Sequence, residues 1–337
     1  MSVTDKNIIP NAMINPAKIA GGLGQPIRNT SKIYYVDGDN GSDVASGKSP
    51  SRAKKTIQAA VTQAGAYSTV YVFPKTITDY TGDPTSYAET IIIPATHVGL
   101  SLIGVNTGRT QGGLPQVKKG SGSTALLTVR AAGCLVANMG FNGSGSTGGG
   151  LLLDDDYAAK CAFGTTIYNC HFKNCVGSTA TNAATGGAIM WSAQGNAWQV
   201  LIKGCRFYKN VGDIVLLGTA NTVPQDVVIE DCVFSGPAAN TDCNIYTGGS
   251  GINGLIIRDC LFTAMPALGG TNDRYVNLTG SVGLMANCYF ASIVSPTGSE
   301  GTFAAAGTLA KIPATMFIAN CYGETTTTAE SGQIFRT

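Results

Sequence analysis

A six-residue pattern of apolar and polar positions recurs along most of the chain. Its first, fourth and sixth positions are apolar, as in Ile229-Glu-Asp-Cys-Val-Phe234 and Ile257-Arg-Asp-Cys-Leu-Phe262. Other copies have the same spacing and begin at Val136 (looser), Ile167, Ile202, Met285 and Ile318 (degenerate). The third positions of successive copies are 31, 35, 27, 28, 28 and 33 residues apart. Because a period of roughly 20–50 residues is typical of repeat architectures, the pattern predicts a solenoid.

The spacing inside the pattern predicts two short strands joined at a corner. The fourth and sixth positions are two apart, so both side chains point to one side of a strand. The first and fourth positions are three apart, so the alternation breaks between them. The residues at the break are of the types that tolerate a left-handed backbone: Asn138, Asn169, Gly204, Asp231, Asp259, Asn287 and Asn320. We therefore expect coils stacked as parallel strands roughly 4.8 Å apart.

A second signature precedes the repeats. It consists of Tyr34-Tyr-Val-Asp-Gly-Asp-Asn-Gly-Ser-Asp43, Gly47-Lys-Ser-Pro50 and Thr56-Ile-Gln-Ala-Ala60. With the repeats, from about 33 to about 322, it resembles the right-handed parallel β-helix of the pectin-lyase-like superfamily, which also occurs in phage tailspikes and other virion surface proteins. The resemblance implies an all-β, single-stranded right-handed parallel β-helix. It does not imply one activity, because lyases, hydrolases, adhesins and inert spikes share this fold.

The regions outside the repeats define the expected domain organisation. Residues 33–97 form the opening strand, a capping helix and the first coil, residues 98–323 form the β-helix coils, and residues 324–337 form a C-terminal tail. The capping helix is predicted over Ser51–Ala64, with its apolar face covering the open edge of the first coil.

Residues 1–32 contain Pro and Gly at a density that favours an extended arm. A disordered tail is the alternative interpretation. We expect the arm to attach the protein to another virion protein of the capsid or tail, through its apolar residues Ile8, Ile9, Ile14 and Ile27.

Composition narrows the function classes. The net charge of +2 provides no field for binding nucleic acid or an anionic membrane. No apolar run approaches the roughly 20 residues of a membrane span. The N-terminus lacks the apolar core of a secretion signal, which favours assembly in a host cytoplasm.

The cysteines follow the repeat. Of the ten, five are predicted to form one inward column, which Cys321 extends: Cys170, Cys205, Cys232, Cys260 and Cys288. Parallel inward side chains have poor disulfide geometry, and no paired Cys or His spacing predicts zinc. We interpret them as buried thiols, and we expect no metal and no cofactor.

Asp154, Asp155 and Asp156 are the most enzyme-like feature of the sequence. One interpretation is that the three carboxylates together bind Ca²⁺. Another is that one of them acts as the base in a reaction on a sugar. The alternative is a solvated turn after a strand, since consecutive strand residues alternate faces. No catalytic residues are predicted otherwise, and these three are the candidates if the chain is an enzyme.

Two outward columns flank the corner. The column before the corner alternates in charge and predicts a cross-strand ladder: Tyr168, Lys203, Glu230, Arg258 and Ala286. The column after it becomes apolar and suggests either a partner or coverage by the protein's own loops: His171, Arg206, Val233, Leu261, Tyr289 and Tyr322. Trp191 and Trp198 flank a loop and are candidates for stacking on sugar rings, or for simple packing.

The residues and the resemblance together favour a non-enzymatic bacteriophage virion protein. It would decorate the capsid or form a spike on the virion surface, with the arm as its anchor and host-surface glycan as a further ligand. The resemblance to virion β-helices favours a homotrimer. A polysaccharide-degrading tailspike, either a lyase or a glycoside hydrolase, is the first alternative, and a surface adhesin is the second.

Overall fold

The computed structural model describes residues 32–76, 85–106, 113–118, 121–144, 148–156, 158–177, 186–192, 197–218, 222–235, 243–248, 251–263, 274–293, 310–325 and 332–333. The attachment arm with Ile8, Ile9, Ile14 and Ile27 lies outside these residues, as does most of the C-terminal tail. Both remain predictions.

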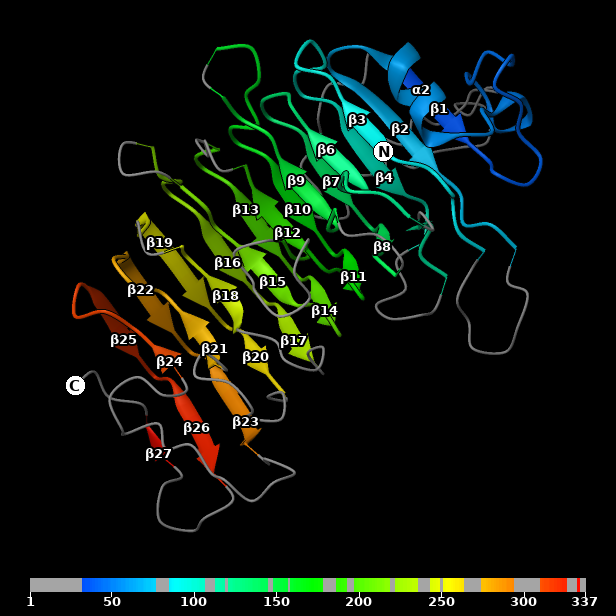
Figure 1. The fold of residues 1–337 in the computed structure, drawn as a ribbon. Coiled ribbons are helices and arrows are strands. Elements are labelled where there is room, and N and C mark those ends of the chain that lie inside the picture. The colour runs from blue at the N-terminus through cyan, green and yellow to red at the C-terminus, as the bar shows by residue number, and fades with distance from the viewer. Residues whose placement is uncertain are drawn as a thin grey trace, which may run out of the picture.

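Three sheets form the faces of the body, and from β4 to β26 the chain visits them in turn (Figure 1). The ten-stranded sheet contains, in order, β1 (Lys32–Val36), β2 (Ser68–Val72), β4 (Ser101–Gly104), β7 (Leu135–Ala137), β10 (Thr166–Tyr168), β13 (Leu201–Lys203), β16 (Val228–Glu230), β19 (Asn253–Arg258), β22 (Val282–Ala286) and β25 (Met316–Ala319).

The nine-stranded sheet contains β5 (Gln116–Lys118), β8 (Gly140–Asn142), β11 (His171–Lys173), β14 (Arg206–Tyr208), β17 (Val233–Ser235), β20 (Leu261–Phe262), β23 (Tyr289–Ile293), β26 (Tyr322–Thr325) and β27 (Gly332–Gln333). The eight-stranded sheet contains β3 (Ile91–Ile93), β6 (Leu127–Val129), β9 (Leu151–Leu153), β12 (Ile189–Trp191), β15 (Gly212–Val215), β18 (Cys243–Tyr246), β21 (Arg274–Asn277) and β24 (Ala310–Lys311).

The strand pairings match the architecture expected from the sequence. Within the described residues, every strand pairs with its sheet neighbours in parallel, except that β26 and β27 are antiparallel. The arrangement is an all-β solenoid, consistent with a right-handed parallel β-helix. No helix in the described part of the chain is long and apolar enough to span a bilayer.

A left-handed corner joins the ten-stranded and nine-stranded sheets, as predicted. All seven residues at the third position of the pattern have a positive φ, from 49° at Asn169 to 66° at Gly204. Where an Asn follows an Asn or Asp on the preceding coil, the two side chains bond along the column: Asn169 Nδ2 donates to Asn138 Oδ1 at 2.8 Å, and Asn287 Nδ2 donates to Asp259 Oδ1 at 3.0 Å. The corner therefore sets the register between coils.

The interior consists of like side chains stacked on one another. Six Phe rings stack with centroids 4.5–5.4 Å apart and planes within 14° of parallel: Phe141, Phe172, Phe207, Phe234, Phe262 and Phe290. The predicted thiol column is confirmed. All six of its members are buried, and successive coils bond beside them, as where Val233 N donates to Cys205 O at 3.0 Å.

The capping helix is shorter than the sequence pattern predicts. Helix α2 spans Ile57–Ala64, whereas Pro50–Arg52 form the separate 3₁₀ helix η2, so the predicted start at Ser51 is wrong. The Asp43 carboxylate accepts hydrogen bonds from the backbone N–H groups of Lys55 and Thr56. These bonds hold the segment between η2 and α2 extended. Helix α2 packs its apolar face on β1, β2 and β3 at the N-terminal end of the solenoid (Figure 1).

Removing one ring from the stack should destabilise the protein strongly. We expect Phe234→Ala to lower the free energy of unfolding by about 3–5 kcal/mol, because a cavity would separate two rings that now sandwich Phe234. Urea denaturation followed by circular dichroism measures this. The control is Phe317→Ala, at a side chain that is 71% exposed, and it should shift the midpoint far less. Equal effects would contradict the stack as a main source of stability.

Candidate functional site

The three consecutive aspartates follow β9 and have different environments. The Asp154 carboxylate contacts Arg130 Nε at 2.8 Å and Lys160 Nζ at 3.3 Å. Asp156 Oδ1 accepts hydrogen bonds from the backbone N–H groups of Ala159 and Lys160, both at 2.9 Å. These bonds lower the pKa of the Asp156 carboxyl. Asp154 is thus ion-paired with two cations, and Asp156 closes a turn.

Asp155 is buried and lies against other partners. Its carbonyl oxygen accepts a hydrogen bond from Ser192 Oγ at 3.0 Å. Burial raises the pKa of the Cys161 thiol, and the nearby Asp155 carboxylate adds to that effect. Among the described residues, no group of three or more His, Cys, Asp or Glu side chains is arranged to hold a metal ion. The role of these aspartates as catalytic residues stays a prediction.

The predicted charge ladder is present on the ten-stranded sheet. Glu230 lies between two cations on adjacent coils: Lys203 Nζ is 2.8 Å from its Oε1, and Arg258 Nε donates to its Oε2 at 2.7 Å. Lys203 also approaches Asp231 at 3.3 Å. These bonds lower the pKa of the Glu230 carboxyl against the opposing effect of burial, which is the larger single influence. The charges therefore neutralise one another between coils.

The two tryptophans have different positions. Trp191 is 1% exposed, and its Nε1 donates to the Ala197 carbonyl at 2.9 Å. Trp198 is half-buried, and its Nε1 donates to the Val223 carbonyl at 3.2 Å. Trp191 therefore belongs to the core, whereas Trp198 is partly accessible to solvent.

The outward column of the nine-stranded sheet has the predicted register. Val233 pairs with Leu261, Leu261 with Tyr289, and Tyr289 with Tyr322. Exposure increases along the column: Val233 and Leu261 are half-buried, Tyr289 is 36% exposed and Tyr322 is 48% exposed. Nothing in the structure identifies what contacts this column, so its role in binding stays a prediction.

The outer face of the eight-stranded sheet is a feature that the sequence reasoning missed. The strands pair so that one outward column joins Thr128, Leu152, Met190, Val215 and Tyr246. Val215 and Cys243 form a small apolar cluster here, which is separate from the main core. The column contains no ionisable group from Thr128 to Val215, so this column offers no carboxylate for acid–base chemistry.

A buried polar cluster was also missed. Asp213 on β15 is 3% exposed, and its two carboxylate oxygens accept hydrogen bonds from Asn210 Nδ2 at 2.8 Å and Asn244 Nδ2 at 2.6 Å. Asn210 Oδ1 in turn accepts a bond from the Cys175 backbone N–H at 2.8 Å. Burial raises the pKa of Asp213 to about 7, although both amide bonds oppose the shift. The only sequence signal was a single acidic residue within Gly212-Asp-Ile-Val215.

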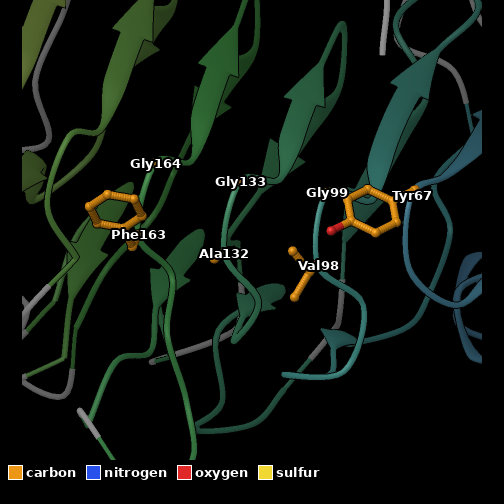
Figure 2. A pocket seen from close by; sticks show the side chains of 7 residues that line it. All are labelled: Tyr67, Val98, Gly99, Ala132, Gly133, Phe163 and Gly164. Atoms are coloured by element: carbon orange, nitrogen blue, oxygen red, sulfur yellow. The ribbon is translucent and has the colours of Figure 1, made fainter. Parts of the chain in front are cut away.

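An apolar groove of about 410 Å³ lies on the corner that precedes the ten-stranded sheet. Figure 2 shows its lining, in which Tyr67 and Phe163 stand at opposite ends of a row of glycine corners. The lining residues are Tyr67, Val98, Gly99, Ala132, Gly133, Phe163 and Gly164. None of them is charged.

Comparison with known proteins identifies the fold but no family. No protein-family model matches the sequence, and no curated protein is similar to it in sequence. The structure is similar to that of a GH136 lacto-N-biosidase from Eubacterium ramulus, with a TM-score of 0.55 and 10% identity over 82% of this chain. It is also similar to pectate lyase Pel9A, with a TM-score of 0.50 and 14% identity over 90% of this chain and 79% of that enzyme.

The chain spans 57% of the length of the lacto-N-biosidase. At this level of identity the similarity establishes a shared parallel β-helix and carries no activity across. The fold expected from the sequence is thereby supported.

The buried Asp213 should make stability depend on pH. Its folded pKa of about 7 lies above the ordinary value of 3.8, so its contribution is complete below about pH 4 and is lost as the pH rises to 7. The loss should amount to a few kcal/mol. We expect Asp213→Asn to flatten the stability profile between pH 4 and 7, measured by urea denaturation.

The control is Asp156→Asn. The Asp156 carboxyl has a lowered pKa, so its contribution is already complete above pH 4, and its loss should leave the slope between pH 4 and 7 unchanged. A wild-type slope that survives in Asp213→Asn would contradict the assignment.

Proposed function

We propose that this chain is a non-enzymatic structural protein of a bacteriophage virion. In this proposal the β-helix decorates the capsid or forms a spike, residues 1–32 anchor it to a capsid or tail protein, and its outer surface contacts host glycan. Assembly takes place in the host cytoplasm, and the mature particle carries the protein on its surface as a homotrimer. The proposal rests on the sequence resemblance to virion β-helices and on the pairing of carboxylates with cations on the surface.

The observation that carries the non-enzymatic part is the mutual neutralisation of charges. Asp154 is held by Arg130 and Lys160, and Glu230 is held by Lys203 and Arg258. A base or nucleophile must be able to reach a substrate atom, and a glycosidase needs two carboxylates that face each other across the bond. In these two clusters of described residues, Asp154 and Glu230 are instead each paired with two cations.

A polysaccharide-active enzyme is the second candidate. The specific observation in its favour is that Arg130 and Asp154 lie on adjacent coils with Lys160 and Asp156 beside them, so carboxylates and cations are within a few ångströms. The similar structures of a lacto-N-biosidase and a pectate lyase show that this fold supports such activities in other proteins. In that case Asp154, Asp155 and Asp156 are the residues to test.

An activity assay separates the two candidates. We expect the purified chain to release neither reducing ends nor unsaturated uronates from host-surface polysaccharide, because its carboxylates are engaged in ion pairs and turns. If cleavage occurs, and if Asp154→Asn or Asp156→Asn abolishes it while Asp226→Asn does not, the enzymatic candidate replaces the structural one.

A particle-association assay tests the virion part. We expect mass spectrometry of purified virus particles carrying this gene to detect the protein. We also expect the full chain, but not a chain lacking residues 1–31, to bind particles from which it has been removed. Recovery of the protein only in the soluble lysate would refute the virion role.

A further inference from the structure

One long stretch of the chain is almost free of carboxylates. Between Glu89 and Asp213 the sequence contains nine Lys and Arg residues but only three acidic residues, Asp154–Asp156. Those three follow β9 of the eight-stranded sheet, where Asp154 is already paired with two cations. The same stretch supplies β5, β8, β11 and β14, the first four strands of the nine-stranded sheet in chain order. The cations on these strands therefore have few acidic neighbours.

The outer face of these four strands is basic. The middle residue of each strand is apolar and buried, so the residues on either side of it face outward. The strand register places the outward residues in two columns, and β8, β11 and β14 lie side by side in Figure 1. One column consists of Gln116, Gly140, His171 and Arg206, and the other of Lys118, Asn142, Lys173 and Tyr208. No outward position on these four strands holds Asp or Glu.

Three cations of this face are not neutralised by the protein. Among the described residues, no ion pair involves Lys118, Arg206 or Lys209. Lys118 and Arg206 are partly exposed, and Lys209, which follows β14 at a corner, is exposed. On the ten-stranded sheet, by contrast, two cations flank Glu230. The face of the nine-stranded sheet therefore lacks the counter-ions that its neighbour contains.

The corners that border this face carry no negative charge. On one side the corner residues are Asn138, Asn169 and Gly204, and on the other they include Asn174 and Lys209. Amide side chains bond between coils on both sides: Asn169 Nδ2 donates to Asn138 Oδ1 at 2.8 Å, and Asn174 Nδ2 donates to Asn142 Oδ1 at 3.3 Å. The basic face thus has rigid and uncharged borders.

We propose that the outer face of β5, β8, β11 and β14 binds an acidic polysaccharide that runs along the solenoid axis. Its anionic groups pair with Lys118, Arg206 and Lys209 through charge-assisted hydrogen bonds. The coils repeat every roughly 4.8 Å. This spacing is close to the length of one sugar unit, so anions on successive units of the glycan meet successive coils. The inference rests on the glycan-contacting part of the proposed function, but it does not depend on the virion part.

The side chains of the face favour this occupant over other polymers. The centre of a protein interface is apolar and aromatic, whereas the two outward columns contain no aliphatic side chain. Single-stranded nucleic acid stacks its bases on aromatic rings. Tyr208 is the one aromatic residue among these outward positions, and Lys209 Nζ already lies 5.2 Å from the centroid of its ring. A neutral glycan would leave the cations without counter-ions.

The test removes single charges and keeps most of each side chain. The variants are Lys118→Gln, Arg206→Gln and Lys209→Gln. The matched controls are Lys55→Gln and Arg52→Gln, which change the net charge equally at exposed positions in the N-terminal cap. Urea denaturation checks that every variant folds. If one of the two partly exposed residues proves necessary for folding, Lys209→Gln at the exposed corner still tests the face.

Binding is measured by fluorescence anisotropy of the full chain with four labelled probes. They are hexagalacturonate, a sulfated heparin hexasaccharide, neutral maltohexaose and a single-stranded oligothymidylate. We expect at least one of the two acidic glycans to bind in low salt, and to bind much more weakly at about 0.5 M NaCl because salt screens exposed charges. The comparison of carboxylated with sulfated probe identifies the anion. Each face variant should weaken binding about tenfold, and the controls should not.

Four outcomes would overturn the proposal. Neither acidic glycan binds, maltohexaose binds as tightly as they do, the control variants weaken binding as much as the face variants, or oligothymidylate binds more tightly than both acidic glycans. The last result would assign the face to nucleic acid. Because no arm of this experiment uses virus particles or measures cleavage, its failure is distinguishable from failure of the proposed function.

Discussion

The structure depends on a single-residue left-handed corner repeated at the same place in every coil. An ordinary residue loses about 1–2 kcal/mol in this conformation, and Asn, Asp and Gly lose much less. Since the corner fixes where one strand ends and the next begins, it also fixes which side chain of each coil lies above its counterpart. The Phe stack, the thiol column and the Lys203–Glu230–Arg258 ladder all follow from that register.

The same register explains why two of the described carboxylates are paired with cations in a fold that polysaccharide-active enzymes share. Stacking places like positions side by side, so a carboxylate is surrounded by whatever occupies its column on the coils above and below. Here Glu230 meets cations, and Asp154 meets Arg130. Apolar residues fill much of the outward column of the eight-stranded sheet. A few substitutions in one column would alter this chemistry without altering the fold, which is why the fold alone does not decide the function.

The parts of the structure that could be predicted are those encoded at a constant offset from the corner. Cys205 and Phe207 are placed correctly because the pattern itself repeats. The start of α2 was missed because Asp43, which holds Thr56 extended, is a distant residue whose carboxylate the helical pattern does not include. The groove and the Asp213–Asn244 bond were missed for another reason. They join residues across loops of unequal length, so only the folded register shows that they are neighbours.

The column of buried thiols has a consequence for how the molecule opens. Burial raises the pKa of Cys205 and Cys232 well above the ordinary value, and the thiol of the preceding coil adds to this. Thiolate, the reactive form, is therefore scarce unless a coil separates from its neighbours. Each coil from Cys170 to Cys321 thus carries its own chemical marker of local opening, and the order in which these sulfurs become alkylated would reveal from which end the solenoid unwinds.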